Sequence, residues 1–550
     1  MHEEVDLDEF APWLILLITL LGGFLRVLML RTKGMWLDET FSIWLANHTV
    51  AEMLQWIAKI DQHPPLYYLL LHYWIARFGD TPYYARLLSA LFGAGTIPII
   101  YLIGKRMSGA MVGLVAAVFL TLSPFHIYFA QETRMYTLLT FNAAVAIYAL
   151  VRLLTDSRAA RPIGGQFWEY LHAWRTFVPV ERPPQAGFSY EDRSRKRWLP
   201  IQNIETDLAW VAFILFSAAT MLSHNTAVLF PLATNIFVLG LILFRRLNQS
   251  APQPVFQAPT LGNWVKAQIG IFVLWSPWLF IFIKQAISVY QRFWIPAPTG
   301  DAVVQALKSF VNASAPMPAD LGSVIWGLYG LVFCLGLVTY RKKLAQLLFL
   351  AALFAVPFLS ELLVSIYRPV FYDRTLIWTT IPLFLILAAG VAQLRLRLLV
   401  FMMIGILGAI NLFAVSDYYR FFQKEDWSTA AGYVAYYAED DDLILFNSNF
   451  VVVAFDYYFE TYEDRYSIRV EKQGVPLDLF DDAVLEPQMT ANDMPRLIAL
   501  LSGHDRVWLV YSHDLYTDPA GLIPQTLASQ MTLTQTRDFY GGQVQLYVTP

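Results

Sequence analysis

Apolar segments long enough to cross a membrane recur along most of this chain, and no other feature restricts its fold as strongly. A membrane-spanning helix needs about 20 predominantly apolar residues. On that criterion the sequence predicts about eleven spans, at residues 12–30, 84–104, 109–128, 135–153, 208–223, 226–244, 264–284, 322–340, 345–366, 375–394 and 398–416. The predicted fold is therefore a polytopic α-helical membrane protein.

The composition supports this class and excludes others. Hydrophobic residues make up 57% of the chain and charged residues only 15%, whereas soluble domains average about 25% charged residues. The net charge of −4 is small and argues against a nucleic-acid partner. The single cysteine, Cys334, gives neither a disulfide framework nor a cysteine-based metal site. The acidic N-terminus lacks the basic start of a cleaved signal, so we expect the first span to be retained.

Basic residues predict the orientation of the spans. They concentrate in alternate loops, which the positive-inside rule places in the cytoplasm. These loops contain Lys105–Arg106, Arg245–Arg246, Arg341–Lys343, Arg395, Arg397 and the long loop 155–207. The N-terminus is then cytoplasmic, and the loop 31–83 and the chain after about residue 417 lie on the outer face. We expect an integral protein of the plasma (inner) membrane.

The sequence changes character near its end, and this predicts two domains. Residues 1–416 form the membrane domain, with a first outer loop (31–83) of amphipathic helices and a cytoplasmic loop (155–207). Residues 417–550 contain short apolar runs separated by charged and turn residues, a pattern typical of a small α/β domain. The expected strands are Leu443–Phe446, Val507–Tyr511 and Gln543–Val548. The expected helices are Ala430–Ala438 and Asp493–Leu501.

Charged and polar residues gather in the predicted outer loops, close to the membrane surface. Asp38 and Glu39 follow the first span, and two prolines hold His63 in an extended segment. Carboxylates, histidines and arginines at one membrane face suit a phosphate-bearing lipid headgroup. The candidate site residues are Asp38, Glu39, Asp61, His63, Arg86, Gln131, Glu132, Arg134, Tyr136, His224 and Arg374.

These residues form four motifs, and through them the chain resembles the membrane glycosyltransferases of the GT-C superfamily. The motifs are Asp38-Glu39, Asp61-x-His63-Pro64-Pro65-Leu66-Tyr67-Tyr68, Arg86-x-x-Ser89 and Gln131-Glu132-x-Arg134-x-Tyr136. The chain is similar to the bacterial family 39 branch, which is related to protein O-mannosyltransferases and the lipid A aminoarabinose transferase. The resemblance covers residues 10–150 well and extends to about residue 416, but says little about the C-terminal domain.

The resemblance implies a reaction and roles for individual residues. A hexosyl or pentosyl unit would pass from a polyprenyl-phosphate-linked donor to an outer acceptor, which could be a protein, a lipid or a cell-envelope glycan. Asp38 matches the catalytic acidic position and would act as general base. Glu39 is its neighbour, and Glu132 matches a second acidic position. His63 stands where the aminoarabinose transferases place a lysine near the lipid phosphate.

The remaining candidates would bind the donor or complete the site. Arginines can stabilise the charge that develops on a departing phosphate. The expected phosphate ligands are His63, Arg86, Arg134 and Arg374, and the further site residues are Asp61, Gln131, Tyr136 and His224. A divalent cation is compatible with these loops, but no ligand spacing requires one, so the cofactor question stays open.

Each assignment has a structural alternative. Asp38 and Glu39 could be loop charges beside basic residues, and His63 could cap a turn. Arg86 and Arg134 could reach lipid headgroups from the membrane interface, and Arg374 could pair only with Asp373. His224 could be a satisfied structural histidine.

The whole protein also has an alternative, as a transporter or lipid flippase. Such proteins usually carry charges near the bilayer midplane. The predicted spans have almost no acidic residues at that depth, with Glu361 the possible exception.

Overall fold

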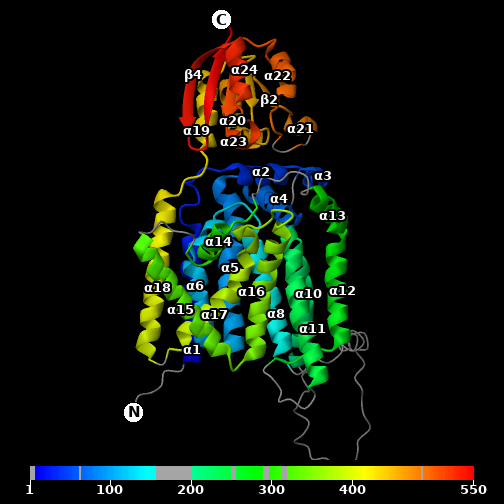
Figure 1. The fold of residues 1–550 in the computed structure, drawn as a ribbon, viewed down its shortest axis with the longest axis vertical. Helices are drawn as coiled ribbons and strands as arrows, with labels where there is room; N and C mark the ends of the chain where they lie inside the picture. The colour runs from blue at the N-terminus through cyan, green and yellow to red at the C-terminus, as the bar shows by residue number, and fades with distance from the viewer. Residues whose placement is uncertain are drawn as a thin grey trace, which may run out of the picture.

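A computed structural model describes residues 7–60, 63–156, 201–248, 256–288, 297–312, 319–394, 396–482, 484 and 487–550. Asp61 and most of the predicted loop 155–207 lie outside these residues. Figure 1 shows a bundle of long helices and a smaller α/β domain at one end of it. The helices α2 (Leu37–Asn47) and α3 (Val50–Lys59) lie across that end, between the bundle and the small domain.

Every predicted span coincides with helical structure. Among the described residues, nine helices are long and apolar enough to cross a membrane, or ten if one bent pair forms a single span. The count of eleven therefore stays a prediction, because α10 (Ile201–Met221) is shorter in its described apolar part, Thr206–Met221. The bundle consists of α1 (Leu7–Val27), α5 (Pro82–Ser108), α6 (Ala110–Leu122), α7 (Pro124–Ala130), α8 (Tyr136–Leu154), α10 (Ile201–Met221), η3 (Asn225–Val228), α11 (Leu229–Leu247), α12 (Leu261–Trp275), η4 (Ser276–Trp278), α13 (Leu279–Ser288), α15 (Ala319–Tyr340), α16 (Leu344–Ser365), η5 (Asp373–Thr379), α17 (Thr380–Ala392) and α18 (Arg397–Phe421).

The bent pair is α6 and α7, which we predicted as one continuous span over 109–128. The two helices meet at an angle of 59°. Pro124 has no N–H to continue the helix, and the Ser123 hydroxyl accepts a hydrogen bond from the His126 N–H, as a helix cap does. The break places the short α7 just before the motif Gln131–Tyr136.

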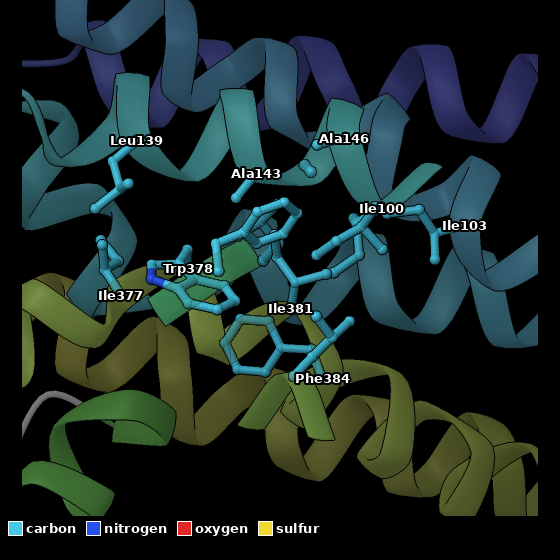
Figure 2. Close-up of a cluster of buried hydrophobic side chains, with 14 of the residues drawn as sticks. Ile100, Ile103, Leu139, Ala143, Ala146, Ile377, Trp378, Ile381 and Phe384 are labelled. Carbon is cyan, nitrogen blue, oxygen red and sulfur yellow. The ribbon is translucent and has the colours of Figure 1, made fainter. Parts of the chain in front are cut away.

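The bundle core forms where α5, α8, η5 and α17 meet. Figure 2 shows aliphatic side chains of α5 and α8 facing Trp378 and Phe384. Helices α15 and α17 approach each other closely beside this core. Gly390 of α17 leaves no room for a side chain, since a Cβ atom there would lie 2.0 Å from the carbonyl oxygen of Val332 in α15. Small residues allow such backbone contact between membrane helices. The labelled core residues are Ile100, Ile103, Leu139, Ala143, Ala146, Ile377, Trp378, Ile381 and Phe384.

The first outer loop folds into short helices, and one more short helix lies after α13. α4 (Leu66–Phe78) follows α3 and packs against α2. α14 (Gly300–Asn312) packs against α7 and η5. We call the end of the bundle that carries α2, α3 and α4 the site face.

The C-terminal domain is a mixed five-stranded sheet with helices. Its strand order is β2-β1-β3-β5-β4; β1 is parallel to β2 and β3, whereas β5 is antiparallel to β3 and β4. The predicted α/β class is confirmed, while β2 and β4 were not predicted. Its elements are α19 (Trp427–Tyr437), β1 (Leu443–Phe446), α20 (Val451–Tyr466), β2 (Glu471–Gly474), α21 (Leu479–Asp482), η6 (Ala491–Asp493), α22 (Met494–Leu501), β3 (Arg506–Tyr511), α23 (Asp514–Thr517), α24 (Leu522–Gln530), β4 (Thr532–Phe539) and β5 (Gly542–Val548).

Helix α20 joins this domain to the site face. Its Phe455 and Phe459 are buried in the domain core. Between them, the Tyr458 hydroxyl accepts a hydrogen bond from the Met35 N–H (2.8 Å), and the Tyr457 hydroxyl donates one to the Asp80 carbonyl (3.0 Å). The domain therefore lies directly on the chain segment that carries the acidic pair.

Candidate active site

Asp38 and Glu39 both lie in the first turn of α2, yet their side chains have different surroundings. Successive residues of an α-helix point about 100° apart, because a turn holds 3.6 residues. The Asp38 side chain keeps 27% of its surface exposed, whereas the Glu39 side chain has none. Of the pair, only Asp38 is accessible to a substrate.

The Glu39 carboxylate is held by cations and amides on both of its oxygens. Arg86 donates to Oε1 and Oε2, each at 2.7 Å, and Lys424 donates to Oε2 at 2.7 Å. The Thr133 N–H donates to Oε1 at 3.0 Å. Burial opposes the charge, but Arg86 and Lys424 outweigh it and hold the Glu39 pKa well below its usual range. Glu39 is therefore an ionised structural anchor for α2.

Arg86 uses all of its N–H donors within the protein. Besides the two bonds to Glu39, it donates to the carbonyl oxygens of Leu30, Lys33 and Gly34 at 2.7–2.9 Å. A guanidinium has five N–H donors, so none remains for a phosphate. This geometry argues against the phosphate contact that the sequence predicted for Arg86. It ties α5 to the segment between α1 and α2 instead.

Lys424 is a buried site residue that the sequence analysis missed. It lies between α18 and α19, and its ammonium contacts Glu39 and also lies 3.5 Å from Glu132 Oε1. Both side chains of the Lys424–Glu132 pair are nearly fully buried. Burial raises the pKa of Glu132, the nearby Glu39 adds to this effect, and Lys424 opposes it. The only sequence signal for Lys424 was its place just after the last predicted span.

Two arginines lie beside the partly exposed Asp38. Its Oδ2 is 3.5 Å from Arg374 Nη1 and 3.9 Å from Arg134 Nε. Two guanidiniums therefore face the Asp38 carboxylate. The structure thus brings together Asp38, Arg134 and Arg374, which the sequence places in three separate segments.

Arg134 also connects several other predicted residues. Its Nη1 lies 3.3 Å from the Tyr68 hydroxyl and 3.4 Å from the Ser42 hydroxyl, and its Nη2 lies 3.5 Å from His63 Nδ1. Behind it, the Tyr67 hydroxyl shares a hydrogen bond with Ser89 (2.9 Å). The predicted motif residues therefore meet around one guanidinium.

His63, His224 and Tyr136 form an aromatic layer next to these arginines. The ring centroids of His63 and His224 are 5.1 Å apart, and those of His224 and Tyr136 are 6.2 Å apart. The Thr226 N–H donates to His224 Nδ1 at 3.2 Å, so the neutral His224 ring carries its proton on Nε2. The guanidinium of Arg374 lies 5.9 Å from the Tyr136 ring centre.

Gln131 has a structural role at the end of α1. Its amide nitrogen donates to the Leu28 carbonyl (2.6 Å) and the Arg26 carbonyl (3.2 Å), and its amide oxygen accepts from the Tyr418 hydroxyl (2.9 Å). It therefore links α1, α18 and the loop that carries Glu132. Among the described residues, no group of three or more His, Cys, Asp or Glu side chains could hold a metal ion.

Known proteins match this chain in part of its sequence and in its fold. A family profile described as dolichyl-phosphate-mannose-protein mannosyltransferase matches residues 62–164. No curated protein sequence matches the chain. The structure of ArnT from Cupriavidus metallidurans in the apo state superimposes with a TM-score of 0.58 at 13% identity, covering 98% of each chain.

Two further solved structures contain polyprenyl-type phosphates. ArnT from Cupriavidus metallidurans bound to undecaprenyl phosphate gives a TM-score of 0.55 at 12% identity over 97% of each chain. The archaeal oligosaccharyltransferase AglB from Archaeoglobus fulgidus, in complex with an inhibitory peptide and a dolichol-phosphate, gives 0.50 at 9% identity, covering 99% of this chain and 74% of AglB. The chain therefore shares the fold of ArnT, and the profile match supports the predicted resemblance to the O-mannosyltransferase branch over residues 62–164.

Proposed function

We propose that this integral membrane protein is a glycosyltransferase that takes a sugar from a polyprenyl-phosphate-linked donor. The observation that carries the proposal is the partly exposed Asp38 carboxylate between Arg134 and Arg374, at one end of a bundle that shares the fold of ArnT. The undecaprenyl phosphate of one structural neighbour and the dolichol-phosphate of another support a lipid phosphate as the donor's leaving group. The matching family profile supports sugar transfer.

In this proposal Asp38 is the general base. It takes the proton from the acceptor hydroxyl or amine while that nucleophile attacks the anomeric carbon. The bond between the sugar and the phosphate oxygen breaks, and polyprenyl phosphate leaves with the bonding electrons. Arg134 and Arg374 stabilise the negative charge that grows on this phosphate. His63, which lies beside Arg134, is a further phosphate ligand.

In the same proposal, Glu39, Arg86 and Glu132 are positioning residues that hold the catalytic groups in place. Their side chains are buried, and Glu39 and Arg86 hold each other through two hydrogen bonds. They fix the first turn of α2 and hence the position of Asp38.

We further propose that the site face lies outside the plasma (inner) membrane, with the N-terminus in the cytoplasm. The acceptor is an outer protein, lipid or cell-envelope glycan, and the sugar a hexosyl or pentosyl unit.

The test compares the wild-type protein with Asp38→Asn in lipid. Both receive a panel of polyprenyl-phosphate sugars and candidate acceptors, and released polyprenyl phosphate is measured by mass spectrometry. We expect sugar-dependent release by the wild type and its loss in Asp38→Asn, with donor binding retained. Asp301→Asn is the matched control, because Asp301 is an exposed carboxylate in the first turn of another short helix, α14.

Two outcomes would contradict the proposal. Equal release by the wild type and Asp38→Asn would exclude Asp38 as the base. Binding of donors without release, combined with movement of labelled lipid phosphate across the bilayer, would favour the flippase alternative.

A further inference from the structure

The segment at residues 422–426 connects the bundle to the C-terminal domain and is fixed at both of its ends. On the bundle side, the Lys33 ammonium donates to the Phe422 carbonyl (2.6 Å). On the domain side, the Asp426 N–H donates to the Tyr540 carbonyl (2.9 Å), and Glu425 lies 3.3 Å from His513. This segment therefore has a defined position over the site face.

Lys424 is the one residue of this segment whose side chain bridges two carboxylates. Its ammonium lies 2.7 Å from Glu39 Oε2 and 3.5 Å from Glu132 Oε1. Glu39 follows Asp38 directly in the first turn of α2, and Glu132 is two residues before Arg134. The bridge thus joins the two segments that carry the proposed base and one of its phosphate ligands.

Lys424 faces the carboxylates of both Glu39 and Glu132, and Arg86 adds a second positive charge at Glu39. A buried carboxylate that loses its cationic partner takes up a proton more easily. The charged and titratable groups that interact with Glu132 or Lys424 from the surrounding elements are Asp38, Glu39, Lys33, Tyr128 and Tyr418; Arg86 and Arg374 act on Tyr418 and Tyr128 in turn.

We propose that Lys424 is a positioning residue that bridges Glu39 and Glu132 and thereby fixes the spacing between Asp38 and Arg134. This inference rests on the proposed function, in which these two residues act on the acceptor and on the phosphate. Lys424 itself is buried, so it acts on the reaction through Glu39 and Glu132. Because it belongs to the segment that the C-terminal domain holds, docking of that domain completes the site.

The first measurement does not depend on enzyme activity. Infrared difference spectroscopy follows the protonation of buried carboxyl groups, and Glu132→Gln identifies the band of Glu132. In Lys424→Met we expect Glu132 to titrate at a pH higher by at least about one unit, because an opposite charge within 4–6 Å shifts a carboxyl by about 1–3 units. Lys33→Met is the matched control: Lys33 donates to the carbonyl groups of Tyr418 and Phe422, so the band should move less than in Lys424→Met.

The second measurement is the reaction. We expect kcat to fall at least tenfold in Lys424→Met with a smaller change in donor KM, and Lys424→Arg to recover most of the loss. An unchanged Glu132 titration in Lys424→Met would overturn the inference even if activity fell. If the wild type transfers no sugar from any donor, the proposed function fails, while the infrared titration still decides whether Lys424 sets the charge of Glu132.

A stability measurement covers the case in which Lys424→Met does not fold. The double variant Lys424→Met/Glu132→Gln removes the charge from both partners, so it should be more stable than Lys424→Met alone. Strictly additive losses would contradict the bridge.

Discussion

Replacing Arg86 by lysine should destabilise the protein although the charge is kept. Arg86 donates five hydrogen bonds, two to Glu39 and three to the carbonyls of Leu30, Lys33 and Gly34. A lysine ammonium has three N–H donors, so at least two of these five hydrogen bonds are lost. A hydrogen bond that involves a charged group contributes about 1.5–3 kcal/mol. The expected loss is therefore about 3–6 kcal/mol, and the bidentate contact that orients Glu39 is lost.

The assay is SDS titration of the folded protein in mixed micelles, followed by tryptophan fluorescence. Arg26→Lys is the matched control, because Arg26 is also buried but donates only three hydrogen bonds, all to carbonyls of Gly22, Leu120 and Thr121. A lysine supplies three donors, so this variant should lose markedly less stability. Equal losses in Arg86→Lys and Arg26→Lys would refute the count of donors as the cause.

Two further predictions follow from the charges of the site. Arg374→Gln should weaken binding of polyprenyl phosphate by about 10- to 150-fold, since a hydrogen bond to a charged group contributes about 1.5–3 kcal/mol and 1.4 kcal/mol is tenfold. Competition against a labelled donor measures this, and unchanged binding would remove Arg374 from the phosphate site. Because the folded protein lowers the pKa of Glu39, its ionisation stabilises the fold above the ordinary glutamate pKa of about 4.3, and this stability is lost as pH falls further. Glu39→Gln should therefore be less stable than the wild type near neutral pH and lose less on acidification, and parallel pH curves in SDS titration would contradict this.

The sequence by itself determined the class of fold, because burial in lipid demands long apolar helices whose length can be read directly. It also brought Asp38, Glu132 and Arg134 forward as candidates, since charged residues beside membrane spans are few and fall into motifs. In the C-terminal domain it located β1, β3 and β5, whose apolar runs are buried. It did not show β2 and β4, since both are mostly polar strands at the sheet edges and carry no apolar pattern.

Only the tertiary structure decided which of the charged residues are exposed and which serve as anchors. Asp38 and Glu39 are adjacent in the sequence, yet the turn of α2 leaves one accessible and buries the other. The partner of Glu39, Lys424, lies 385 positions away and belongs to a segment that resembles an ordinary charged linker. A local pattern cannot reveal such a pair, because the low-dielectric interior that makes the two charges depend on each other exists only after the distant segments have packed together.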